Sequence, residues 1–203
     1  MADAVISSPA SLPVGPMGRH GVGWWGAGTL IASEAALFAY LLFSYYYTGA
    51  TAPAGWLLEP RPSLKLALPN TLLLLLSSVF AWWAEQGVLK ARRPQALLGF
   101  AAAVLMGSGF AAVQWLEWQA KSYGLGTSNY ASLYFVTTGF HMAHVIVGLA
   151  VLIALFVWTA LDYFSRRRRL VVSAGVLYWH FVDAVWLFVF TTYYLTPYLG
   201  FAR

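Results

Sequence analysis

The chain has 203 residues, of which 60% are hydrophobic and only 9% are charged. This balance excludes a soluble globular domain and a disordered chain, and it is typical of an integral membrane protein. The absence of cysteine excludes disulfides, thiolate-bound metals and iron–sulfur clusters.

The N-terminal segment, residues 1–23, is rich in Pro, Gly and Ser and lacks the basic start of a secretory signal. We predict that it is a flexible cytoplasmic lead into one transmembrane domain, residues 24–203. A helix needs about 20 apolar residues to cross the hydrocarbon core. Five stretches meet that length, and we predict spans near 24–47, 65–87, 95–118, 131–160 and 171–197.

These five spans are predicted to be helices. Lipid cannot satisfy open backbone groups, so only helices or a closed barrel can cross, and the apolar and polar alternation of barrel strands is missing here. The predicted fold class is therefore all-α, an integral membrane bundle of five transmembrane helices.

Basic residues between the spans predict the orientation. Most of them fall in the second and fourth loops, so the positive-inside rule places these loops and the N-terminus in the cytoplasm and the C-terminus outside. Topology thus accounts for the net charge of +5 without a nucleic-acid partner. The same loops are candidates for binding anionic lipid; their arginines are Arg92, Arg93, Arg166, Arg167, Arg168 and Arg169.

Two other residue types predict how the bundle sits and packs. Aromatic residues near the span ends, including Tyr45, Tyr193 and Tyr194, are interpreted as anchors at the membrane–water interface. Small residues inside the spans, including Gly107 and Gly148, predict close helix contacts.

Ionisable residues recur at mid-depth, where they are costly and therefore functional by default. Glu34 lies about 15 Å into the first span at 1.5 Å per residue. His141 and His144 lie at a similar depth in the fourth span, and His180 and Asp183 in the fifth. We expect Glu34 and Asp183 to point away from lipid, toward these histidines, in one buried polar cluster.

Three interpretations of this cluster are open from the residues alone. It is a structural polar staple between helices, a proton-handling group, or a metal site. Secondary polar positions are Asn70, next to a proline in the second span, and Gln114 and Glu117 near the outer end of the third. A stand-alone membrane metalloenzyme or a proton-coupled carrier using the His/Glu/Asp cluster is the alternative function.

Two long motifs carry a resemblance to a known family. The runs YFVTTGFHMAHVIVG from Tyr134 to Gly148 and YWHFVDAVWLF from Tyr178 to Phe188 resemble subunit III of the haem–copper cytochrome c oxidases. Shorter matches agree in order along the chain: Ser33-Glu34, Pro69-Asn70-Thr71, and Gln114 with Glu117. Because the chain begins at the Ser-Glu helix, it is similar to the five-helix bacterial form.

The resemblance implies a subunit with no catalytic residues, metal or redox cofactor of its own. Haem and copper are expected in partner subunits I and II of an aerobic respiratory oxidase in a bacterial plasma membrane. The family role implied is to stabilise the catalytic subunit, support proton uptake and bind structural phospholipid. It also implies that Glu34 and His144 form a buried hydrogen-bonded pair, with His141, His180 and Asp183 nearby.

Overall fold

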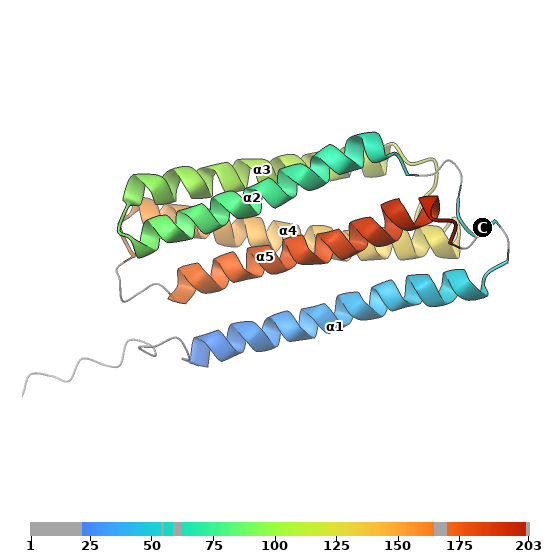
Figure 1. Ribbon diagram of the computed structural model, residues 1–203, viewed down its shortest axis with the longest axis horizontal. Helices are drawn as coiled ribbons and strands as arrows, with labels where there is room; N and C mark the ends of the chain where they lie inside the picture. The colour runs from blue at the N-terminus through green and yellow to red at the C-terminus, as the bar shows by residue number, and fades with distance from the viewer. Residues whose placement is uncertain (1–21, 54, 59–61, 165–169, 202–203) are drawn as a thin grey trace, which may run out of the picture.

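The computed structural model describes residues 22–53, 55–58, 62–164 and 170–201, and this described part contains helices and no strand. The helices are α1 (Val22–Thr51), α2 (Leu64–Leu89), α3 (Arg93–Gln119), α4 (Asn129–Ala160) and α5 (Leu170–Phe190) (Figure 1). Within these residues, five helical segments are long and apolar enough to cross a membrane. The predicted all-α bundle with five transmembrane helices is therefore confirmed.

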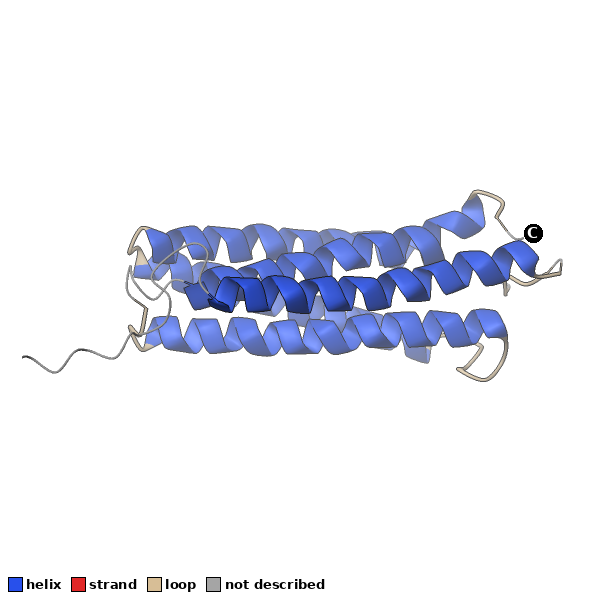
Figure 2. Ribbon diagram, turned by 90° about the horizontal axis from the view of Figure 1, so that it is seen from below, coloured by secondary structure: helices blue, strands red, loops and turns tan. Residues whose placement is uncertain are grey.

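The helices form a ring of four with a fifth helix outside it. Helices α2, α3, α4 and α5 each pack on two neighbours of the ring, and α1 packs on α4 and α5. Figures 1 and 2 show the axes running nearly parallel, with α1 along one edge. Figure 1 shows each helix beginning at the end of the bundle where the preceding helix stops, so consecutive helices are antiparallel, as successive membrane crossings require.

The last membrane-spanning segment, Leu170–Tyr198, is not regular α-helix along its whole length. Regular α-helix stops at Phe190 and is followed by a π-helical turn, Thr191–Leu195, and a short 3-10 turn, Thr196–Tyr198. Pro197 lacks the backbone N–H that a continuing helix would use. The wider turn before it turns both Tyr193 and Tyr194 inward, where they are fully buried.

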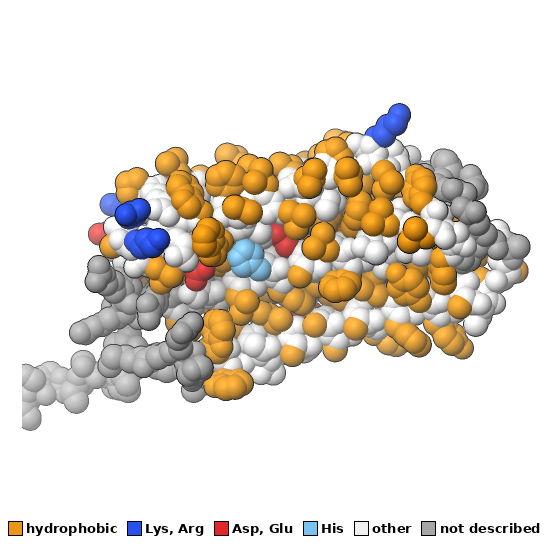
Figure 3. Space-filling model, viewed as in Figure 1, with side chains coloured by type: hydrophobic (Ala, Val, Ile, Leu, Met, Phe, Trp, Pro, Cys, Tyr) orange, Lys and Arg blue, Asp and Glu red, His pale blue; other side chains and the backbone are white. Residues whose placement is uncertain are grey.

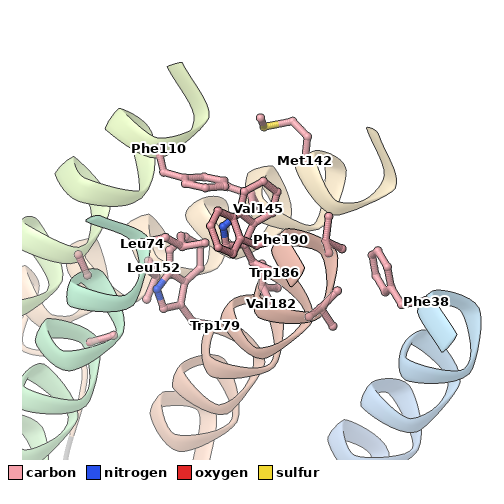
Figure 4. Packing of buried hydrophobic residues seen from close by; sticks show 14 of the residues in the cluster. Phe38, Leu74, Phe110, Met142, Val145, Leu152, Trp179, Val182, Trp186 and Phe190 are labelled. Carbon is pink, nitrogen blue, oxygen red and sulfur yellow. The ribbon is translucent and has the colours of Figure 1, made fainter. Parts of the chain in front are cut away.

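Trp179 of α5 fills the centre of the ring by lying against two glycines. A Cβ at Gly107 of α3 would lie 2.8 Å from its ring, and a Cβ at Gly148 of α4 would lie 2.6 Å from it. Figure 4 shows Trp179 and Trp186 of α5 and Phe110 of α3 lying close together in this core. The predicted close approach of helices at Gly107 and Gly148 is therefore confirmed.

Replacing Gly148 by Ala is expected to destabilise the bundle by about 1–3 kcal/mol, because the added methyl would overlap the Trp179 ring. The measurement is the free energy of unfolding in mixed micelles. Gly139 lies on the same helix, and a Cβ added there would meet no atom within 4 Å. Gly139→Ala is the matched control, and it should be neutral or more stable by about 0.5–1 kcal/mol. Equal effects of the two changes would contradict this packing.

The anchor interpretation is wrong for three of the aromatic residues. Tyr45, Tyr193 and Tyr194 are each 0% exposed and belong to a cluster at the α1–α2 loop end of the bundle. The Tyr45 and Tyr193 ring centroids are 4.8 Å apart. Because these rings pack between helices, they hold the end of the bundle together and do not face its surroundings.

Lys and Arg side chains lie toward the ends of the molecule in the view of Figure 3, and the length between them is mostly hydrophobic, interrupted by a few acidic and histidine side chains. Arg92 and Arg93 are exposed at the α2–α3 loop, and Arg93 donates a hydrogen bond to the carbonyl of Ala160 at the end of α4. The predicted sites at residues 166–169 and in residues 1–21 lie outside the described residues. Orientation and anionic-lipid binding therefore stay predictions.

Candidate functional site

Glu34 and His144 form a direct pair between α1 and α4. Oε2 of Glu34 lies 2.9 Å from Nε2 of His144, and the other ring nitrogen, Nδ1, lies 2.6 Å from the carbonyl oxygen of Phe140 one turn earlier. The side chain of Glu34 is 28% exposed and that of His144 is 13% exposed. The ring of Phe38 covers His144 from α1, at 5.1 Å between centroids.

These contacts fix the position of one hydrogen of the pair and limit the second to two positions. A carbonyl oxygen only accepts, so Nδ1 of His144 must carry a hydrogen. Nε2 and Oε2 then need one more hydrogen between them, held either by the imidazolium or by the carboxylic acid. Since the pair is neutral overall in both forms, it avoids most of the cost of an isolated charge at this depth.

An apolar cleft of about 620 Å³ opens beside this pair, between α1, α4 and α5. Glu34, His144 and Tyr178 are its polar lining residues. The aliphatic part of its wall includes Leu30, Ile31, Val147, Val151 and Leu170. The exposed part of Glu34 therefore faces a space that suits hydrocarbon, with the Glu34–His144 pair at its wall.

His141 does not join the pair, although it lies three residues before His144. It is buried, and its Nε2 lies 3.2 Å from the carbonyl oxygen of Val182 on α5, to which it donates a hydrogen bond. Its ring packs at 4.8 Å from Trp186. His141 is therefore positioned as a hydrogen-bonded link between α4 and α5.

His180 and Asp183 meet α2. Nδ1 of His180 lies 3.0 Å from Oγ of Ser78. Ser78 also lies near the buried carboxyl of Asp183 and interacts with it, although neither carboxyl oxygen reaches full hydrogen-bond geometry with a described group. The predicted single cluster is thus divided among three contacts: Glu34 with His144, His141 with α5, and His180 and Asp183 with Ser78.

The α2–α5 seam is joined by further polar contacts at regular intervals. Trp186 donates from Nε1 to Thr71 at 2.9 Å, and Trp179 donates from Nε1 to Ser77 at 3.0 Å. Nearer the α2–α3 loop, Ser173 donates to Glu85 at 2.6 Å. These pairs follow the antiparallel register of the two helices, so they hold α5 at a defined height against α2.

A second polar group surrounds Glu117, close to the end of α3 that leads into the α3–α4 loop. Its Oε1 accepts a hydrogen bond from Tyr194 at 2.8 Å and lies 3.5 Å from the hydroxyl of Tyr134. Lys121 makes an ion pair with the same oxygen at 3.0 Å. Sequence reasoning named Glu117 only as a secondary position and did not find these partners. The i,i+4 spacing of Glu117 and Lys121 could have predicted their ion pair, because residues four apart are neighbours on a helix.

The two remaining secondary positions are buried amides. Asn70 of α2 donates from Nδ2 to the carbonyl of Phe110 on α3 at 3.3 Å. Gln114 is 1% exposed, and neither atom of its amide has a partner at full hydrogen-bond geometry, although it lies close enough to interact with Tyr194. Asn70 thus ties α2 to α3, and Gln114 extends the polar group around Glu117 inward.

In the part of the chain that the structure describes, no group of three or more His, Cys, Asp or Glu side chains could hold a metal ion. The geometry offers a neutral proton-holding pair beside an apolar cleft and a set of hydrogen bonds between helices. Such an arrangement can bind an amphiphile and keep helices in register, and it can exchange one proton.

Comparison with known proteins agrees with the sequence motifs. Residues 17–198 match the model of a family described as cytochrome c oxidase subunit III. The chain is 32% identical over 179 residues to cytochrome c oxidase subunit 3 of Locusta migratoria, covering 84% of this chain and 67% of that protein. It is 33% identical to the same subunit of Ornithorhynchus anatinus over 173 residues, covering 81% and 66%. The chain thus spans about two thirds of the length of these relatives.

Proposed function

Because the chain belongs to the cytochrome c oxidase subunit III family, we propose that it is a non-catalytic subunit of an aerobic respiratory haem–copper oxidase. The family match, which covers most of the chain, is the observation that carries this proposal. In this role the chain lies beside subunits I and II in a bacterial plasma membrane. Haem and copper are held by those partners and supply the oxygen chemistry there.

The chain stabilises its catalytic neighbour, and the polar pairs between helices support that role. The contacts of Glu34, His141 and His180 each join two different helices. A subunit whose helices are kept in register presents a constant surface to its partner. The Glu34–His144 pair additionally holds one exchangeable proton, which supports the proposed part in proton uptake.

The cleft between α1, α4 and α5 binds an acyl chain of a phospholipid. Its wall is aliphatic, and each methylene buried there contributes about 0.8 kcal/mol. Leu170 lines the cleft, and in the sequence it directly follows the four arginines 166–169. Basic clusters of this kind attract anionic headgroups at about 1 kcal/mol per charge.

Purification through a tag on this chain tests the proposal. The expected product shows the visible absorption of haem in constant ratio to the chain, and phospholipid remains bound after detergent washing. Ala174 lines the cleft, so Ala174→Phe should lower the lipid-to-haem ratio by filling it. Ala112→Phe, on an exposed position of α3, is the matched control. A preparation without haem would refute the oxidase assignment, and equal lipid content in both variants would refute the lipid site.

A further inference from the structure

We propose that the face formed by α2 and α5 around His180 is the surface that contacts a membrane-spanning partner, and that this partner presents hydrogen-bond donors to it. The inference rests on the proposed function, in which the partner is the catalytic subunit.

Two acidic groups and one imidazole lie at this surface. Asp183 is buried beside Ser78. Nδ1 of His180 lies 3.0 Å from Oγ of Ser78, and Nε2 of His180 makes no hydrogen bond with a described residue. Glu85 supplies an acceptor, because Ser173 occupies only its Oε1.

Lipid cannot satisfy the second nitrogen of His180. His180 lies about 15 Å into α5 at 1.5 Å per residue, a depth at which hydrocarbon offers no hydrogen bond. It is only half-buried within this chain. The other mid-depth histidines differ, since His141 is only 1% exposed and both ring nitrogens of His144 have partners within the chain. His180 is therefore the half-buried mid-depth histidine whose second nitrogen is open to a neighbour from outside the chain.

The charges at this face match a donor-bearing partner. Glu85 and Asp183 are acidic, and the ion pairs found among the described residues join Glu117 with Lys121 and Glu34 with His144. Figure 3 shows acidic and histidine side chains together within an otherwise hydrophobic field on the side where α2 and α5 face the reader. A transmembrane helix bearing hydroxyl, amide or guanidinium groups at this depth would complement the surface in both charge and hydrogen bonding.

The apolar surroundings suit a packed helix. Trp82 lies four residues after Ser78 on α2, and Ala184 and Leu187 follow His180 by four and seven residues on α5. Trp82 is 52% exposed and Leu187 is 41% exposed. Exposed apolar side chains thus lie near His180 on both helices. The seam contacts of Ser77 with Trp179 and of Ser173 with Glu85 keep the face in one arrangement.

Photo-cross-linking in native membranes tests the assignment. A benzophenone amino acid replaces Trp82 or Ala184 in the full chain, and Tyr40 of α1 or Leu105 of α3, both highly exposed, serves as the matched control. We expect the first two positions to cross-link to one haem-containing membrane protein in at least several-fold higher yield than the controls. Higher yield from Tyr40 or Leu105, cross-links only to lipid, or cross-links to a second copy of this chain would overturn the inference.

Substitution of His180 provides an independent measurement. His180→Leu should weaken retention of the chain by the purified complex about three- to tenfold, the effect of losing one membrane hydrogen bond. His180→Gln keeps a carbonyl acceptor and should retain most of the association. Unchanged retention in both variants would contradict the proposal. If His180→Leu lowers the unfolding temperature of the isolated chain, weaker retention no longer separates lost folding from lost docking. The cross-linking yields then decide whether this face contacts the partner.

The two proposals fail in different ways. If haem co-purifies with the chain but protein cross-links arise from α1 or α3, the oxidase assignment stands and the docking face is wrong. If Ala184 cross-links to a membrane protein that contains no haem, the docking face stands and the oxidase assignment is wrong.

Discussion

Replacing His144 by Leu will destabilise the bundle more than replacing Glu34 and His144 together. The single change leaves the Glu34 carboxyl beside an apolar cleft without its partner at 2.9 Å. An unpaired carboxylate at mid-membrane costs about 2.5–3.5 kcal/mol, and protonation lowers this cost without restoring the hydrogen bond. The double change to Glu34→Leu and His144→Leu removes both polar groups, so this penalty disappears.

The measurement is a double-mutant cycle on the free energy of unfolding in mixed micelles. A coupling energy of about 0.6–1.7 kcal/mol is expected for one hydrogen-bonded pair in a membrane bundle. His141→Leu is a useful comparison, because His141 bonds a backbone carbonyl on α5 and should not couple to Glu34. A coupling near zero between Glu34 and His144 would show that the pair contributes nothing to the fold.

Glu34→Gln separates the staple interpretation from the proton-handling one. The amide can donate a hydrogen bond to Nε2 of His144 while removing the titratable carboxyl. A purely structural pair would then leave oxidase assembly and proton uptake unchanged. If the pair handles protons, assembly is retained but proton uptake by the purified complex becomes slower, with the larger effect at high pH where protons are scarce.

Glu117→Leu will have the largest effect on stability among single substitutions at the polar sites. It removes the acceptor of Tyr194 and the counter-charge of Lys121, which is only 12% exposed. Breaking a buried ion pair by removing one partner costs about 3–5 kcal/mol, because the remaining charge is left uncompensated. The flexible Lys121 can move its ammonium toward water, so the lower end of that range is expected.

Two matched changes check this explanation. Glu117→Gln keeps a carbonyl acceptor for Tyr194, so its loss should be smaller. Combining Glu117→Leu with Lys121→Met removes the stranded charge and should recover at least about 1 kcal/mol, the order of cost of an unpaired polar group. Unfolding free energies that are additive across the pair would instead mean that Glu117 and Lys121 act independently.

Some tertiary contacts could be predicted from the sequence because their cause is local or comes from a long motif. The resemblance implied the Glu34–His144 pair, and the structure places these two side chains in contact. Gly107 and Gly148 were expected at close helix contacts because they have no side chain, and Trp179 occupies the space beside both. Neither prediction required knowing the rotation of every helix.

Other contacts could not be predicted, and the ionisable residues show why. His141 and His144 lie three residues apart and thus share a helix face, but His141 turns to Val182 while His144 turns to Glu34. A rotation of about 300° between such residues leaves them about 60° apart around the axis, enough to face different neighbours. Which neighbours are present depends on helices far away in the sequence.

The sequence by itself determined that this chain forms five membrane-spanning helices, because hydrophobic length is a local property measured against the thickness of the bilayer. It also determined the family, through two motifs in α4 and α5. Only the tertiary structure decided that Tyr45, Tyr193 and Tyr194 lie inside and that His180 remains half-buried on the α2–α5 face. The reason is that burial within lipid depends on how each helix is rotated against its neighbours, and apolar helices show little amphipathic preference to set that rotation in advance.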